Sequence, residues 1–315
     1  MAQPSNLYDS YDQTGIREDL TDVIYNIDPF DTPFMSMIGR GGAKNTLHEW
    51  QTDGLASPAS NAQIEGDEAS NQALSPTSRV GNYTQISTKT CQISGTDDGL
   101  DKAGRNREMA YQMSKKMKEL RLDMEHAMVG VNNARVAGNA STARELGSVT
   151  SWIATNDSFG SGGASPTGNG TDARTDGTQR AFTEALLQGV LQTTYTAGGN
   201  PNTLMVGAFN KQQVSGFSGN ATSVDHTNTD KRVINSVDIY EGDFHTLKVV
   251  PNRVLRTRDA LVLQPDMWST AFLRPLAATP LAKTGDSERK MLVTEYTLVS
   301  KNEAASGGIF DLTTS

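Results

Sequence analysis

The stretch MAYQMSKKMKELRLDMEHAM, residues 109–128, decides the fold class. It carries five of the eleven methionines, at steps of four, four, seven and four residues, and Leu120 fills the gap in the same stripe. Residues at these spacings lie on one side of an α-helix. We expect a long helix from about residue 105 to about residue 131, resting on an uneven surface that flexible methionine side chains fill.

A metal site is the alternative explanation of the methionine stripe, because thioethers can ligate soft metals such as Cu(I). Such a site usually includes Cys or His as well. His126 is the one such residue in this stretch, and it lies off the stripe, beside Glu125. Packing therefore explains the stripe better. A metal role would predict that Met113 or Met117 is exposed, and we expect neither to be exposed.

Composition and charge exclude several classes of protein. Hydrophobic residues make up 36% of the chain and the net charge is −8. An acidic chain is unsuited to tight, salt-dependent duplex binding, which requires a basic face. The single cysteine, Cys91, excludes an internal disulfide framework and is typical of a reducing compartment. Neither a secretory signal nor an apolar run long enough to span a membrane is present, so we expect no membrane association.

Two extended regions precede the helix. In the polar N-terminal region we expect no regular helix around Pro29 and Pro33, because proline disrupts helices. Phe30 and Phe34 then remain as anchors on an extended arm. Residues 46–96 read as a long β excursion, with NTLHEWQTDG (45–54) leading out and YTQISTKTCQISGT (83–96) leading back. Residues 55–82 lie between them, and loops of this length are either disordered or functional.

After the long helix, helices and strands alternate. TARE (142–145) has the form of a capping box that opens a short helix. A second helix is expected over 178–197, a strand over 202–209, and a short helix over 210–217 capped by Asn210. Three β-hairpins are expected, over residues 237–251, 260–275 and 290–313. The fold class is therefore α+β with a long spine helix.

No motif of the chain indicates catalysis. The four histidines are scattered singly, and no metal-binding, nucleotide-binding or nucleophile motif appears. We expect no catalytic, cofactor-binding or metal-binding residues, and no enzymatic activity.

Four long segments carry a resemblance to a known family. They are TGIREDLTDVIYNIDPFDTPFMS (14–36), CQISGTDDGLDKAG (91–104) leading into ELRLDMEHAM (119–128), VDIYEGDFHTLKVVPNRVL (237–255), and LRPLAATPLAKTGDSERKMLVTEYTLVSKNEAASGGI (273–309). In this order they resemble major capsid proteins of tailed bacteriophages with the Hong Kong 97-type fold, and more narrowly a podovirus-associated capsid family. The resemblance covers nearly the whole chain.

The resemblance implies a division into four regions. Residues 1–45 would form an N-terminal arm and residues 46–96 an extended E-loop that lies over a neighbouring subunit. Residues 97–140 and 266–315 would form the peripheral domain with the spine helix, and residues 141–265 the axial domain. The axial tip would be GNATSVDHTNTDKRVIN (219–235), with Asp225 and Asp230 facing Lys231 or Arg232 of the next subunit.

The function implied is a major capsid protein that assembles into pentamers and hexamers of an icosahedral shell around phage double-stranded DNA. A cellular nanocompartment shell of the same fold and a hydrolase with an unrecognised site are the alternatives. The residues expected at contacts between subunits are Phe30, Phe34, Trp50, Ile64, Arg79, Asp225, Asp230, Lys231 and Arg232.

The resemblance also implies partners and a location. Besides copies of itself, we expect a portal protein, a decoration protein in some forms, and packaged DNA in weak, non-specific proximity. No long scaffold-like segment precedes the arm, so we expect a separate scaffolding protein. The protein is expected in the virion capsid, after assembly in the host bacterial cytoplasm.

Some relatives crosslink lysine to asparagine. The one lysine of residues 46–96, Lys89, lies at the base of the E-loop, so we do not expect that crosslink here.

Overall fold

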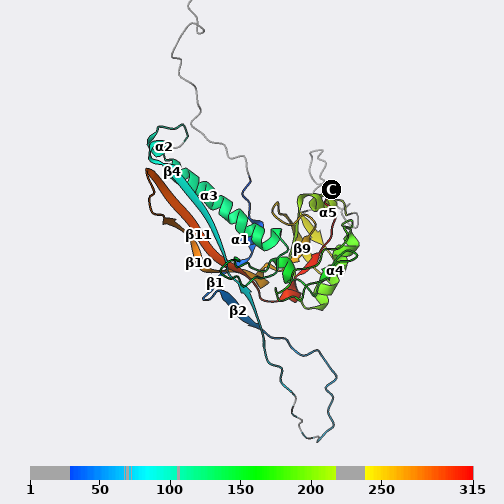
Figure 1. Ribbon diagram of the computed structural model, residues 1–315. Coiled ribbons are helices and arrows are strands. Elements are labelled where there is room, and N and C mark those ends of the chain that lie inside the picture. The colour runs from blue at the N-terminus through cyan, green and yellow to red at the C-terminus, as the bar shows by residue number, and fades with distance from the viewer. Residues whose placement is uncertain are drawn as a thin grey trace, which may run out of the picture.

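The computed structural model describes residues 29–66, 68, 71, 73–104, 107–217 and 238–314. A long, narrow sheet lined by a helix forms one part of the molecule, a compact lobe forms the other, and a long loop projects away from both (Figure 1). The helices are α1 (Pro33–Met37), α2 (Gly95–Gly99), α3 (Glu108–Glu125), a π-helical turn η1 (His126–Gly130), α4 (Glu184–Thr196), α5 (Ala208–Ser215), and the 3₁₀ turns η2 (Val149–Ser151), η3 (Pro265–Met267) and η4 (Glu303–Ala305).

The strands form three sheets. They are β1 (Gly39–Gly42), β2 (Leu47–Thr52), β3 (Ser78–Tyr83), β4 (Gln85–Ser94), β5 (Asp157–Ser158), β6 (Thr203–Val206), β7 (Ile239–Glu241), β8 (Thr246–Pro251), β9 (Ala260–Leu263), β10 (Trp268–Pro280), β11 (Ser287–Ser300) and β12 (Gly307–Ile309). The long sheet has the order β1-β10-β11-β4, the lobe sheet has the order β5-β12-β9-β6-β8-β7, and β2 pairs with β3 alone.

Helix α3 rests on the long sheet and confirms the predicted spine helix. Met109, Leu120, Met124 and Met128 are buried, so most of the stripe packs as expected. Met113 is half-buried, but Met117 is 36% exposed, and the expectation that it would not be exposed was wrong. Steps of four residues turn the stripe by about 40° each. Near residue 124 the displaced side chains are covered by Phe34 and the core around Trp268, whereas Met117 lies beyond that cover.

The lobe has its own hydrophobic core. Strands β6 and β9 are wholly buried at the centre of the sheet, and α4 and α5 contribute apolar residues to the same cluster. The predicted hairpin over 237–251 is confirmed as β7 and β8. The other two hairpins were wrong, because β9 and β10 belong to different sheets, as do β11 and β12. Alternating residues identify a strand, but they do not identify its partner.

The β excursion pairs differently from the prediction. The strand that returns to β2 is β3, from within the segment taken as loop, and not residues 83–96. Strand β4 instead pairs antiparallel with β11 along the edge of the long sheet. Between Thr52 and Ser78 the described residues form no strand. We call residues 53–77 the projecting loop.

Several predicted helix boundaries also need correction. Pro33 does not exclude helix. It occupies the first turn of α1, where its missing N–H costs nothing. Helix α5 begins after Gly207, and Asn210 is a buried residue inside it that donates to the Thr257 carbonyl. Residues 142–145 form no helix, because Glu145 pairs in a β-bridge with Val136. No helix among the described ranges is both long and apolar enough to cross a membrane.

Candidate assembly surfaces

The base of the N-terminal arm, residues 29–45, is anchored inside the subunit. The side chain of Phe34 is fully buried and meets Trp268 edge-on at 6.5 Å between ring centroids. Strand β1 then extends the long sheet by pairing parallel with β10. Phe30 lies further out, 51% exposed, with the Lys118 ammonium 4.5 Å from its ring centroid. The arm base is thus held at one end and exposed at the other.

A buried carboxylate, Glu125, joins the arm base to the rest of the subunit. Its two oxygens accept hydrogen bonds from the backbone N–H of Phe34 at 2.8 Å and of Met35 at 2.9 Å. The side-chain amide of Asn252, in the lobe, donates to the same carboxylate at 2.8 Å. Thr32, at the N-cap of α1, makes no side-chain capping bond, so Glu125 satisfies amides that a cap residue would normally satisfy.

The surroundings of Glu125 act on its pKa in opposite directions. Burial raises the pKa, because the charged form loses its hydration, and the three donated hydrogen bonds lower it. The net direction is upward. The burial of Glu125 was not predicted from the sequence. No local pattern identifies it, because its partners are 90 or more residues away in the chain.

The base of the projecting loop is also held firmly. The indole N–H of Trp50 donates to the Ser300 carbonyl at 2.8 Å, and its ring lies 5.4 Å from that of Trp152. Asn82, on β3, is buried. Its side chain donates to the Leu298 carbonyl at 2.9 Å and accepts from the Gly147 N–H at 2.8 Å. These contacts join the base of the loop to both the long sheet and the lobe.

The projecting loop itself exposes apolar side chains. Leu55, Ile64 and Leu74 have relative exposures of 102%, 80% and 95%. They are the three most exposed large apolar side chains in the described part of the chain. At the base, Arg79 is largely exposed and pairs with Glu49 at 3.2 Å.

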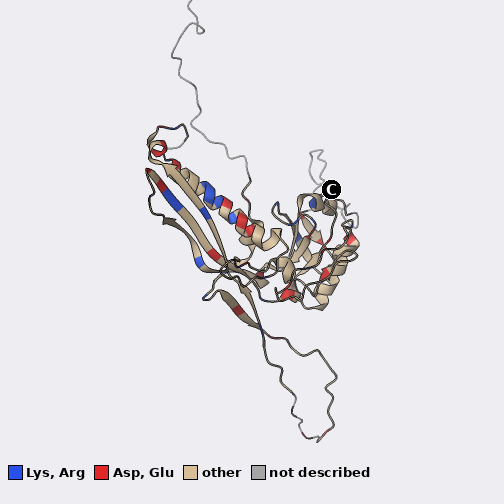
Figure 2. Ribbon diagram, viewed as in Figure 1, with Lys and Arg blue, Asp and Glu red and all other residues tan. Residues whose placement is uncertain are grey.

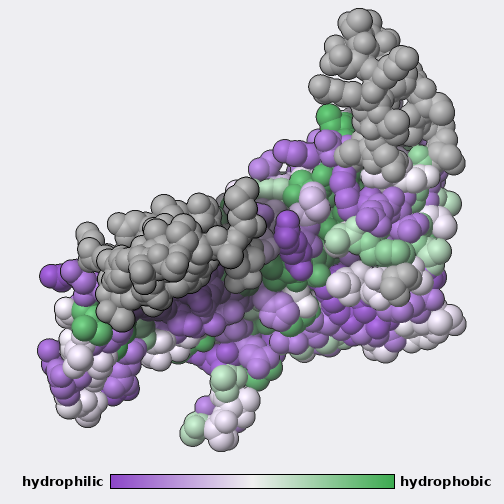
Figure 3. All heavy atoms as spheres, turned by 90° about the horizontal axis from the view of Figure 1, so that it is seen from above, coloured by the Kyte–Doolittle hydropathy of each residue, from purple (hydrophilic) through white to green (hydrophobic). Residues whose placement is uncertain are grey.

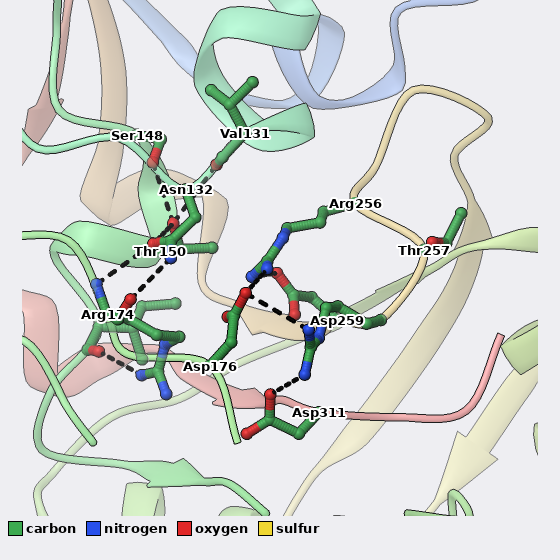
Figure 4. Close-up of polar contacts among 12 residues, drawn as sticks. Val131, Asn132, Ser148, Thr150, Arg174, Asp176, Arg256, Thr257, Asp259 and Asp311 are labelled. Carbon is green, nitrogen blue, oxygen red and sulfur yellow. Dashed lines mark hydrogen bonds and ion pairs between the residues drawn. The ribbon is translucent and has the colours of Figure 1, made fainter. Parts of the chain in front are cut away.

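A network of charged residues ties the glycine-rich segment 159–177 to the lobe (Figure 4). Asp176 lies between Arg256 and Arg258, and Arg258 also pairs with Asp311 at 2.5 Å. Arg174 is buried and pairs with Asp157 at 2.6 Å.

Asp259 lies in the same network and is wholly buried. Burial raises its pKa to about 7, although Arg256 and Arg174 act in the opposite direction. The charges in the network are largely matched in pairs within the subunit. They are suited to holding the segment in place rather than to binding a ligand.

No group of three or more His, Cys, Asp or Glu that could hold a metal occurs among the described residues. A cleft of about 590 Å³ lies where the base of the projecting loop meets the lobe, between Trp152, Asn169 and Glu303. Glu303 accepts from the backbone N–H of Ala154 and Thr155 there, which is a structural role.

The predicted contact residues lie in three different settings. Phe34 and Trp50 make their described contacts inside the subunit and position the arm and the loop. Phe30, Ile64 and Arg79 are exposed, and their contact with a neighbour remains a prediction. Asp225, Asp230, Lys231 and Arg232 lie outside the described residues.

Comparisons with known proteins agree with this geometry. The family model described as SU10 major capsid protein matches residues 5–313. The major capsid protein of Escherichia phage Phieco32 is 30% identical over 352 residues, covering 98% of each chain. Among solved structures, the cyanophage A-1(L) capsid matches with a TM-score of 0.69 at 12% identity, over 95% of this chain and 97% of that one. The phage G major capsid and decoration protein structure matches with a TM-score of 0.53 at 9% identity, over 99% of this chain and 100% of that one.

Proposed function

Because the chain belongs to the SU10 major capsid protein family, it is a tailed-phage major capsid protein with the Hong Kong 97-type fold, and we propose how its parts build the shell. Copies of the chain associate into pentamers and hexamers of an icosahedral shell that encloses double-stranded DNA. In this arrangement the projecting loop of each subunit lies over its neighbour and buries Leu55, Ile64 and Leu74 there. The exposure of these three side chains carries the proposal.

For the four regions we propose the roles that the resemblance implies, with one change of boundary: residues 1–45 as the arm, 46–96 as the E-loop, 97–140 with 266–315 as the peripheral domain, and 141–265 as the axial domain. The pairing of β4 with β11 supports moving residues 85–96 from the E-loop to the peripheral domain. The ion pair of Lys89 with Asp123 at 2.7 Å supports a structural role for this lysine rather than a crosslink.

The proposal extends to further partners. The net charge of −8 favours only weak, non-specific proximity to packaged DNA. The phage G structure contains decoration proteins beside its capsid proteins, and we extend this partner to the present chain. A portal protein, a separate scaffolding protein and assembly in the host cytoplasm complete the proposal, with no enzymatic role.

The proposal is tested by particle formation in three forms of the full chain, measured by light scattering and negative-stain microscopy. Wild type is expected to form closed shells. The triple variant Leu55→Ser, Ile64→Ser, Leu74→Ser is expected to form none, while its thermal midpoint stays unchanged, because these side chains are largely exposed in the subunit. The control Ser57→Ala, Ser60→Ala, Ser75→Ala changes the same loop and is expected to assemble as wild type does. Normal shells from the first variant would contradict the proposal.

A further inference from the structure

The outward face of α3 is basic, although the helix as a whole has mixed charge. The four acidic residues of the helix are either buried or paired with a lysine. Glu108 and Glu125 are buried, Asp123 pairs with Lys89 at 2.7 Å, and Glu119 pairs with Lys116 at 2.8 Å. The exposed bases that remain are Lys115, Lys118 and Arg121. Figure 2 shows Lys and Arg in blue along the middle of α3, and no carboxylate of the described residues pairs with these three bases.

An apolar area adjoins these bases. Met117 is 36% exposed on α3, and Phe30 is 51% exposed where its ring meets Lys118. Where it is not drawn in grey, the surface seen from above is mostly hydrophilic with smaller hydrophobic areas (Figure 3). An exposed Met and an exposed Phe therefore stand beside the three bases as an apolar area. We call this area, residues 114–121 with Phe30, the α3 face.

The arm base runs along α3 toward the α3 face. The Phe34 amide lies at Glu125, and four residues earlier the Phe30 ring lies at Lys118. Moving back along the arm therefore means moving toward the N-terminal end of α3. The arm base, followed back to Phe30, thus leads to the exposed part of the helix, and residues 16–28 precede it in the chain.

Those preceding residues have a matching sequence. In IREDLTDVIYNID (16–28) the apolar residues follow a helical spacing of i, i+4, i+7, i+8 and i+11, namely Ile16, Leu20, Val23, Ile24 and Ile27. The segment holds four acidic residues and one basic residue, so its charge is opposite to that of the α3 face. As a helix it would be about 20 Å long, comparable to the distance of about 15 Å from Glu108 to Lys118 along α3.

We propose that residues 16–28 form an amphipathic helix that docks on the α3 face of the same subunit, with the apolar stripe over Met117 and Phe30 and carboxylates beside Lys115, Lys118 and Arg121. The same subunit is the occupant because Pro29 alone separates the segment from Phe30, which is already fixed on this helix. The docked helix would cover the one exposed methionine of the α3 stripe.

Cysteine crosslinking of the full chain tests the docking. In a Cys91→Ser background, Ile24→Cys with Met117→Cys is treated with a short bismaleimide, and the products are identified by peptide mass spectrometry and by their size on denaturing gels. A crosslink within one chain is expected. The control pair Ile24→Cys with Thr88→Cys, which uses an exposed position on β4, is expected to give none. A covalent dimer would show that a second copy occupies the face, and no crosslink would show that nothing docks there. Either result overturns the proposal.

Charge reversal gives an independent test. Lys115→Glu, Lys118→Glu, Arg121→Glu is expected to speed amide hydrogen exchange in residues 16–28 at least about tenfold, with the buried strands β6 and β9 unchanged. The control Lys44→Glu, Arg253→Glu, Lys283→Glu makes the same change in charge at exposed positions elsewhere and is expected to leave this exchange unchanged. Adding Asp19→Lys and Asp28→Lys to the first variant is expected to restore part of the protection. Equal exchange in the two triple variants would overturn the proposal. Both tests use unassembled subunits, so they remain decisive even if shell formation fails.

Discussion

The arm base and the projecting loop both extend from the body of the subunit, but they differ in where their apolar residues lie. The arm base places Phe34 in the core and satisfies its amides with Glu125. The projecting loop is fixed at its base, by Trp50 and Asn82, and leaves Leu55, Ile64 and Leu74 exposed. This difference in burial corresponds to two different roles of the residues in an extension. Buried polar anchors set the direction of an extension, and exposed apolar residues further along it are available to a neighbouring subunit.

The largest expected effect on stability comes from removing the anchor of the arm. Glu125→Ala leaves three donors without their acceptor in a buried site, and we expect a loss of about 3 kcal/mol in the free energy of unfolding. Urea unfolding measures it. Glu119→Ala, on the same helix but half-exposed, is the control and should cost less than about 1 kcal/mol. Equal losses in the two variants would show that Glu125 is not a special anchor.

The corresponding change at the loop base is smaller. Asn82→Ala removes the hydrogen bonds to the Leu298 carbonyl and from the Gly147 N–H, so we expect a loss of about 2 kcal/mol. Amide exchange in β2 and β3 should rise at the same time. Asn61→Ala, exposed in the projecting loop, should change neither quantity. If β2 and β3 stay protected in Asn82→Ala, Trp50 alone holds the loop base.

The charged network of the lobe should make stability depend on pH through Asp259. The pKa of Asp259 is about 7 in the folded protein and 3.8 ordinarily, so between about pH 4 and 7 the folded state binds more protons than the unfolded state. The free energy of unfolding therefore falls as pH rises through this window, by at most about 1.4 kcal/mol per pH unit from this group. Asp259→Asn should remove that slope in urea unfolding at several pH values. Asp53→Asn, in the exposed loop, should keep it.

Much of the fold could be predicted because its signals are local. The spine helix follows from the methionine spacing, and the β7–β8 hairpin follows from two strands joined by a short turn. The pairing of β4 with β11, the separation of β9 from β10 and the burial of Glu125 could not be predicted in this way. Each depends on residues far apart in the chain, and a single sequence carries no pattern that relates them.

The sequence by itself thus predicts the long helix, the extended arm and the long loop, and its four long segments indicate the family. Folding decides which charges remain on the surface. Along α3 the acids turn inward or pair with neighbouring lysines, which leaves Lys115, Lys118 and Arg121 outward. The reason is that a carboxylate is buried only where distant donors meet it, as the amides of Phe34, Met35 and Asn252 meet Glu125, and those donors come together only when the arm, the helix and the lobe pack.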